Sequence, residues 1–280
     1  MSAVNVVVDA PVRRGAAASP QSPLLEVQGV HISFGGIVAL DDVSFSVQSG
    51  CICGLIGPNG AGKTTLFNCL SGLYRPQRGT LRFAGQSTLD LPRHHMAKLG
   101  IGRTFQNLAL FGSMSVERNV LVGGYAAHGG GYLASMLDLP GARESERALR
   151  HDCKELLALL DLEDVAGERV SNLPFGTQKR VEFARALACR PRLLLLDEPA
   201  ASLTHEEVED LRALILKLQR TLGLTVLLVE HHMGLVMGVA DQVVVLSFGR
   251  KIADGRAADV RSHPEVIRAY LGGDAHDAAA

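Results

Sequence analysis

Apolar and polar positions along the chain follow two different periods. Residues 24–27 and 43–47 largely alternate apolar with polar side chains, which predicts half-buried β-strands. The runs 193–196 and 225–229 are almost entirely apolar, as is typical of parallel strands that are covered on both faces. The run 51–56 has the same character. We therefore expect an α/β chain built around buried strands.

Helical periods fill the stretches between these runs. A helix can follow the first buried strand at 66–70, and another is predicted at 176–188. Charged side chains of the second helix are spaced for surface pairs, at Lys179, Arg180, Glu182 and Arg185. From about 107 to 190 the pattern is mostly helical and more polar, which predicts an α-helical insert.

Shorter patterns complete the expected order of elements. Pro92 suits the first turn of a short helix at 92–98, and Ser115 can cap the first helix of the insert. The remaining expected elements are strands at 79–83, 101–106 and 242–246, a hairpin return arm at 249–253 and a closing amphipathic helix at 264–271.

Composition and charge narrow the class of protein. The chain has 280 residues, 47% of them hydrophobic, which is enough for one large domain or two modest ones. The net charge of −1 gives no general electrostatic footprint for nucleic acid. No apolar run approaches the ~20 residues that span a bilayer, so we expect any contact with a membrane to be peripheral.

The chain ends and the cysteines add two expectations. Residues 1–22 are rich in Ala, Ser and Pro and are predicted to be a disordered tail, and residues 273–280 are expected to be a C-terminal tail. The five cysteines lie in apolar or helical stretches, which fits a reducing cytosol. Cys51 and Cys53 lack a second pair that would complete a zinc site, so buried small side chains are favoured over metal ligands.

The most informative stretch follows the first buried strand. It comprises Gly57, Pro58, Asn59, Gly60, Ala61, Gly62, Lys63, Thr64 and Thr65. This order fits the phosphate-loop pattern G-x-x-x-x-G-K-[ST] in its required context, between a strand and a helix. Glycines let successive backbone N–H groups converge on an anion at the positive end of the helix. Lys63 would reach the β- and γ-phosphates of a nucleotide, Thr64 would ligate Mg²⁺, and Thr65 can add a hydroxyl contact.

Two adjacent carboxylates, Asp197 and Glu198, follow the four-leucine strand. Ligands bind at this end of the strands in open α/β sheets. Two buried carboxylates that repel each other are costly unless they have a partner that compensates their charge, so Mg²⁺ and water are the natural partners. Asp197 is positioned to hold the hydration shell of the metal, and Glu198 to accept a proton from attacking water.

Four further positions have more than one interpretation. Phe34 can stack on an adenine face or pack normally. Gln106 can accept from water, coordinate a cation or cap a loop, and its spacing alone favours the loop. His231 could hydrogen-bond a γ-phosphate oxygen or sense its loss, whereas metal binding by the adjacent histidines lacks an evident third ligand. The helix entry at 173–177 offers either a second anion site or simple capping.

In this order, the motifs resemble an ABC-type ATPase domain over about residues 23–272. The likeness implies a P-loop NTPase core with an antiparallel β subdomain and the helical insert, ATP and Mg²⁺ as cofactors, and no nucleic-acid partner. By this likeness, Phe34 is the adenine-stacking residue, residues 57–65 are Walker A, and Gln106 is the Q-loop glutamine and a metal ligand. Residues 173–177, which include Gly176, are the signature segment. Asp197 ends Walker B, Glu198 is the catalytic carboxylate and His231 is the switch histidine.

A narrower likeness is to the ATP-binding subunit of branched-chain amino-acid importers. It is carried by residues 33–40, 56–69, 103–106, 230–231, 235–238 and 266–272. It implies an ATP-hydrolysing subunit at the cytoplasmic face of the cell membrane, paired with a second ATPase subunit, bound to membrane permeases and acting indirectly with a substrate-binding protein. Urea or amide importers, a lipopolysaccharide-type exporter, a soluble ABC clamp and a non-hydrolytic assembly module remain as alternatives.

Three residues depart from the pattern of the family. Pro174 replaces the usual signature serine and removes a hydroxyl and an N–H, Thr204 stands where aspartate is common, and His232 replaces the aspartate that often follows the switch histidine. Because Gly176 keeps its N–H, we expect hydrolysis to be retained.

Overall fold

The computed structural model describes residues 22–104, 108–128, 140–201 and 203–271. Its four-stranded sheet has the order β2-β1-β4-β5, and all of its pairs are antiparallel. The strands are β1 (Leu25–Phe34), β2 (Ile37–Val47), β4 (Arg78–Phe83) and β5 (Gln86–Ser87). The two alternating runs near the N-terminus therefore lie in strands, as predicted, and both strands are longer than the runs.

The second sheet has six strands in the order β10-β9-β3-β8-β7-β6. They are β3 (Ile52–Ile56), β6 (Ile101–Arg103), β7 (Leu193–Asp197), β8 (Thr225–Val229), β9 (Gln242–Ser247) and β10 (Arg250–Gly255). All pairs are parallel except the β9–β10 hairpin. Every residue of β3, β7 and β8 is buried, which confirms the central parallel strands expected from the apolar runs.

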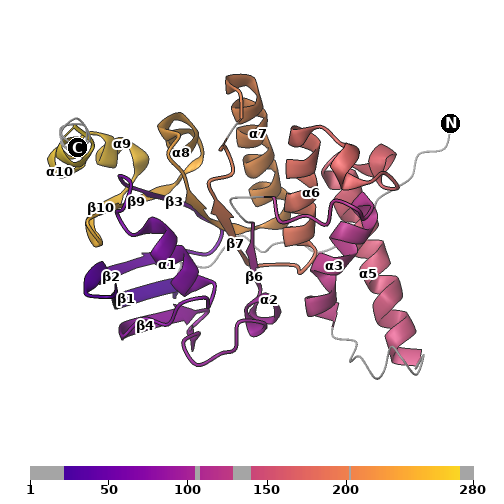
Figure 1. The fold of residues 1–280 in the computed structure, drawn as a ribbon, viewed down its shortest axis with the longest axis horizontal. Helices are drawn as coiled ribbons and strands as arrows, with labels where there is room; N and C mark the ends of the chain where they lie inside the picture. Colours follow the sequence, from indigo (N-terminus) through magenta and orange to yellow (C-terminus); the bar gives the residue numbers. More distant parts are fainter. Residues whose placement is uncertain (1–21, 105–107, 129–139, 202, 272–280) are drawn as a thin grey trace, which may run out of the picture.

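The six-stranded sheet separates two hydrophobic cores. Side chains that point to one face, such as Leu194 and Leu196, pack with helices α6, α7 and α8, and side chains that point to the other, such as Leu193 and Leu195, pack with α1 and the four-stranded sheet. Figure 1 shows the same layers, with α3 and α5 forming a lobe beside the sheet. The helices are α1 (Lys63–Leu70), α2 (His95–Leu99), α3 (Val116–His128), α5 (Pro140–Leu159), α6 (Phe175–Leu187), α7 (His205–Leu222), α8 (Met233–Val239), α9 (Ala257–Arg261) and α10 (Pro264–Leu271), with 3₁₀ turns η1 (Glu163–Val165) and η2 (Val170–Asn172).

Two local expectations are confirmed and two are wrong. Ser115 caps α3, since its hydroxyl accepts from the Arg118 N–H at 3.3 Å, and Cys53 is a buried side chain, while Cys51 is half-buried. Pro92 lies before the helix and not in its first turn, because α2 begins at His95; the Pro92 carbonyl oxygen accepts from the His95 N–H at 2.8 Å in the turn that leads into α2. Lys179 and Glu182 do not form a surface pair: they are 6% and 2% exposed, because α6 packs among the other elements of one hydrophobic core.

Several predictions fall outside the described residues or remain predictions. Gln106 and the tails at 1–21 and 272–280 are not described, so the expected domain limits stay predictions. Among the described helices, none has the length and apolar character that a bilayer crossing requires.

Candidate active site

The phosphate loop lies between β3 and α1, as predicted. Gly57, Gly60 and Gly62 have φ values of 151°, 75° and 98°, in the region that favours glycine. A Cβ on Gly57 would clash with the Leu246 carbonyl oxygen, so this turn also depends on the close approach of β9. Gly62 is the N-cap of α1, and Lys63 is the first residue of this helix.

Lys63 is buried inside its own loop. Its Nζ donates to the carbonyl oxygens of Gly57, at 2.6 Å, and Pro58, at 2.8 Å. Burial lowers the pKa of Lys63, and the charge of the nearby Glu198 carboxylate acts in the opposite direction. The ammonium group is therefore held inside the phosphate loop, and Glu198 lies close enough to affect its pKa.

Glu198 and His231 meet across the ends of two neighbouring strands. Glu198 Oε1 lies 2.6 Å from His231 Nε2, and the Glu198 N–H donates to the Val229 carbonyl oxygen at 2.9 Å. Glu198 has a φ of 47°, which is uncommon for a side chain of its size. The structure thus brings together Lys63 of α1, Glu198 directly after β7 and His231 in the loop after β8.

Glu230 fixes the loop that carries His231, a role that sequence reasoning missed. It is 3% exposed, and its carboxylate accepts from the N–H groups of Ala200 at 2.6 Å, His231 at 3.0 Å and His232 at 3.2 Å. A carboxylate directly after a buried strand was the available signal, the same signal that pointed to Asp197.

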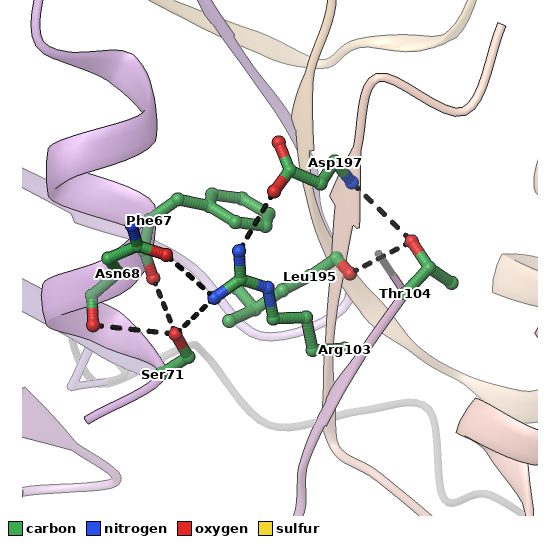
Figure 2. A network of polar contacts seen from close by, with 7 residues as sticks. All are labelled: Phe67, Asn68, Ser71, Arg103, Thr104, Leu195 and Asp197. Atoms are coloured by element: carbon green, nitrogen blue, oxygen red, sulfur yellow. Dashed lines mark hydrogen bonds and ion pairs between the residues drawn. The ribbon is translucent and has the colours of Figure 1, made fainter. Parts of the chain in front are cut away.

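Asp197 is buried at the end of β7 and paired with Arg103. Arg103 Nη2 donates to Asp197 Oδ2 at 2.9 Å, and the second carboxylate oxygen points away from Arg103 (Figure 2). Burial raises the pKa of Asp197, while the Arg103 hydrogen bond and charge act in the opposite direction. This acid carries a free-pointing oxygen of the kind that hard cations prefer.

The other predicted residues occupy separate places. Thr64 and Thr65 lie in the first turn of α1, and Thr64 is exposed. Phe34 ends β1, where its exposed ring lies edge-on to Tyr74 with 5.2 Å between centroids. Gly176 lies in the first turn of α6, and a Cβ there would be 3.8 Å from Glu207 Oε1 of α7. Because β1 and α6 belong to opposite sides of the central sheet, the chain does not bring Phe34 and Gly176 together (Figure 1).

The departures at Thr204 and His232 are both helix caps. Thr204 and Glu207 form a capping box at the start of α7. His232 Nδ1 accepts from the Leu235 N–H at 3.2 Å and so caps α8. Each residue keeps the acceptor that an aspartate would supply at the same place.

Comparison with known proteins decides the family. The family described as "ABC transporter" matches residues 40–201, more than half of the chain. The chain belongs to the ABC transporter family. Its core is an ATP-binding cassette of ABC ATPase type, and a second family, described as "Branched-chain amino acid ATP-binding cassette transporter", matches residues 250–276 of the cassette.

Relatives of the cassette carry closely similar names. It is 43% identical to the high-affinity branched-chain amino acid transport ATP-binding protein BraF of Pseudomonas aeruginosa. The alignment spans 250 residues, which are 89% of this chain and 98% of BraF. It is 40% identical, with the same coverage, to LivG of Escherichia coli K12, which has the same description. The methionine import ATP-binding protein MetN of Rhizobium etli is 37% identical over 265 residues, 93% of this chain and 68% of MetN.

Solved structures agree with the fold of the cassette. A nucleotide-free ATP-binding cassette of an ABC transporter superposes with a TM-score of 0.77 at 30% identity, covering 89% of this chain and 99% of the other. The ADP conformation of an ATP-binding cassette of an ABC transporter superposes with a TM-score of 0.77 at 28% identity. This alignment covers 90% of the present chain and 100% of the other. The predicted ABC ATPase fold is confirmed.

Proposed function

We propose that this chain is the ATP-hydrolysing subunit that powers an ABC importer for branched-chain or other hydrophobic amino acids. The observation that carries hydrolysis is the contact between Glu198 and His231 beside Lys63. The BraF and LivG relatives support branched-chain amino acids as the cargo of the importer, and MetN supports amino-acid import more broadly.

ATP hydrolysis is assigned to three side chains. Lys63 would exchange the carbonyl oxygens of its loop for the β- and γ-phosphates of ATP. Glu198 would accept a proton as the water oxygen bonds the γ-phosphorus and the bond to the leaving oxygen of ADP breaks. His231 would hold the transferring group, and Phe34 would stack on the adenine.

The predicted ligands fit Mg²⁺. The Asp197 carboxylate supplies a hard oxygen that points away from Arg103, Thr64 in the first turn of α1 supplies a hydroxyl, and Gln106 is a third predicted ligand from outside the described residues. When bound, the ion neutralises charge on the β- and γ-phosphate oxygens. The chain would contribute the orientation of these oxygens, and at Asp197 one of the two carboxylate oxygens accepts from Arg103.

The proposed partner subunit follows from the place of the signature segment, which lies away from the residues proposed to bind the nucleotide in the same chain. The segment 173–177, with the Gly176 N–H, lies on the other side of the central sheet from the four-stranded sheet that carries Phe34. We propose that it completes the site of a second ATPase subunit, either another copy or a sister chain. The dimer would bind integral permeases at the cytoplasmic face of the membrane and act indirectly with a substrate-binding protein outside it.

Reconstitution tests this function. The chain, expressed with its membrane partners and purified from detergent-solubilised membranes, is expected to co-purify with permease subunits. In proteoliposomes the complex should couple MgATP hydrolysis to leucine uptake, and Lys63→Ala should abolish both. Failure of any permease subunit to co-purify, or uptake of urea in place of leucine, would contradict the proposal.

A further inference from the structure

Arg103, the last residue of β6, connects three elements of the site (Figure 2). Its Nη1 donates to Asn68 Oδ1 at 3.0 Å and to Ser71 Oγ at 2.5 Å, and both acceptors belong to the helix that starts at the phosphate loop or to its C-cap. Its Nη2 donates to Asp197 Oδ2 at 2.9 Å. One guanidinium group therefore joins β6, β7 and the C-terminal end of α1.

The surroundings leave this side chain little freedom. The guanidinium lies over the Phe67 ring, with Cζ 5.1 Å from the centroid. The side chains of Arg103 and Asp197 are only 13% and 7% exposed. The Ser71 hydroxyl is itself fixed, because it donates to the Phe67 carbonyl oxygen at 2.9 Å. Buried ion pairs of this kind depend on geometry, since both charges have lost most of their water.

The next residue holds the backbone of Asp197. Thr104 N–H donates to the Leu195 carbonyl oxygen at 2.9 Å, and Thr104 Oγ1 accepts from the Asp197 N–H at 3.4 Å. Thus the end of β6 contacts Asp197 twice, at its backbone through Thr104 and at its carboxylate through Arg103.

From this geometry we propose that Arg103 is a positioning residue for metal binding, which holds Asp197 Oδ2 so that Oδ1 is presented to the ion. The inference rests on the proposed role of Asp197 in holding Mg²⁺. Outer partners that orient a metal-binding carboxylate affect metal affinity strongly although they never touch the metal. Because Asn68 and Ser71 anchor the same guanidinium, Arg103 also fixes the carboxylate relative to α1.

Lysine cannot replace arginine in this position. The planar guanidinium presents two nitrogens in a fixed fork, one to α1 and one to Asp197, whereas an ammonium is a single point charge. Arg103→Lys therefore keeps the positive charge beside Asp197 and removes the bridge. This variant separates orientation of the carboxylate from simple charge balance.

The test measures nucleotide binding rather than turnover. Binding of a fluorescent ATP analogue is titrated in Mg²⁺ and again in EDTA. We expect Arg103→Lys to leave the affinity in EDTA unchanged and to weaken the Mg²⁺-dependent tightening by about 10- to 100-fold, the usual cost of losing an outer partner of a metal ligand. Arg150→Lys is the matched control, since Arg150 forms an exposed pair with Glu146 on α5 and should change neither affinity.

A second variant guards against misfolding. Asn68→Ala with Ser71→Ala removes the anchors on α1 but leaves Arg103 and Asp197 in place, and it should show a smaller loss of the same Mg²⁺-dependent tightening. The inference is overturned if both variants keep the wild-type response to Mg²⁺, or if Arg103→Met binds the Mg²⁺ complex more tightly than wild type, which would make Arg103 a competitor of the ion. If wild type itself shows no response to Mg²⁺, the proposed role of Asp197 fails instead.

Discussion

Glu198 Oε1 and His231 Nε2 are 2.6 Å apart, although the residues are 33 positions apart in the chain. They follow β7 and β8, which are adjacent parallel strands, so their side chains leave the sheet at the same edge. Glu230 holds the loop of His231 by accepting three backbone N–H groups. The contact is thus set by the sheet and by one buried carboxylate.

Replacing Glu198 with glutamine should separate binding from hydrolysis. Glu198→Gln keeps the shape and a hydrogen bond to His231 but cannot accept a proton, so kcat should fall by about 10²- to 10⁴-fold. Binding of ATP, measured by fluorescence titration, should remain. Glu265→Gln, an exposed glutamate on α10, is the control and should keep wild-type kcat. Rapid turnover by Glu198→Gln would remove this residue from its assigned role.

Lys63 should control stabilisation by the nucleotide. Lys63 Nζ donates to the carbonyl oxygens of Gly57 and Pro58 in its own loop, so Lys63→Ala should fold and lose its affinity for the phosphates. At ATP concentrations of about 100 times the Kd, a ligand stabilises the folded state by about 2.7 kcal/mol. Thermal unfolding should show this shift for wild type and not for Lys63→Ala. An equal shift in both would mean that ATP binds elsewhere.

The buried pair in α6 should matter for stability. Lys179 Nζ lies 3.5 Å from Glu182 Oε2 and 5.7 Å from the centroid of the Phe175 ring. Lys179→Met removes this cation from the buried carboxylate, which keeps other interactions, and should lower the free energy of unfolding by about 1–3 kcal/mol. Adding Glu182→Leu should recover part of that loss. Urea unfolding of the two variants and of Arg150→Met, an exposed control, checks this, and equal losses for Arg150→Met and Lys179→Met would contradict it.

The capping box of α7 should contribute a pH-dependent increment of stability. Hydrogen bonds from the Thr204 N–H and hydroxyl hold the pKa of Glu207 below its ordinary value of 4.5. Because the folded pKa is the lower one, this stabilisation is fully present above about pH 4.5 and is lost as the pH falls through the folded pKa. Wild type should therefore exceed Glu207→Gln in unfolding free energy at neutral pH, and the difference should shrink in acid. A difference that grows in acid would reverse the sign of this effect.

The parts of the site that sequence predicted best are local in the chain. The phosphate loop depends on glycines and a lysine within nine positions, and its φ values follow from those glycines. The central strands were readable because each face of β3, β7 and β8 meets a separate core, which requires apolar residues at every position. Asp197 and Glu198 were predicted as site residues because two adjacent carboxylates at the end of a buried strand are costly unless they bind a cation or water.

The parts that sequence missed depend on contacts far apart in the chain. Arg103 and Asp197 are 94 positions apart, and no period of either segment indicates that they pair. Lys179 and Glu182 have the spacing of an exposed helical pair, and they are buried because other elements of the core pack on α6. The capping box was a different kind of omission, because the spacing from Thr204 to Glu207 was readable.

Serine at position 174 should strengthen the signature segment. Pro174 is the N-cap of α6 with φ −56° and ψ 151°, and its side chain makes no capping hydrogen bond. Pro174→Ser restores an N–H and a hydroxyl that the proposed second subunit could use at the nucleotide. One net hydrogen bond contributes about 1 kcal/mol, so dimerisation of Glu198→Gln in MgATP should tighten by about fivefold when Pro174→Ser is added. Analytical ultracentrifugation measures this, with Pro174→Ala as the variant that restores the N–H alone and should give a smaller gain. Identical dimerisation with proline, alanine and serine would mean that this segment does not contact the nucleotide of the second subunit.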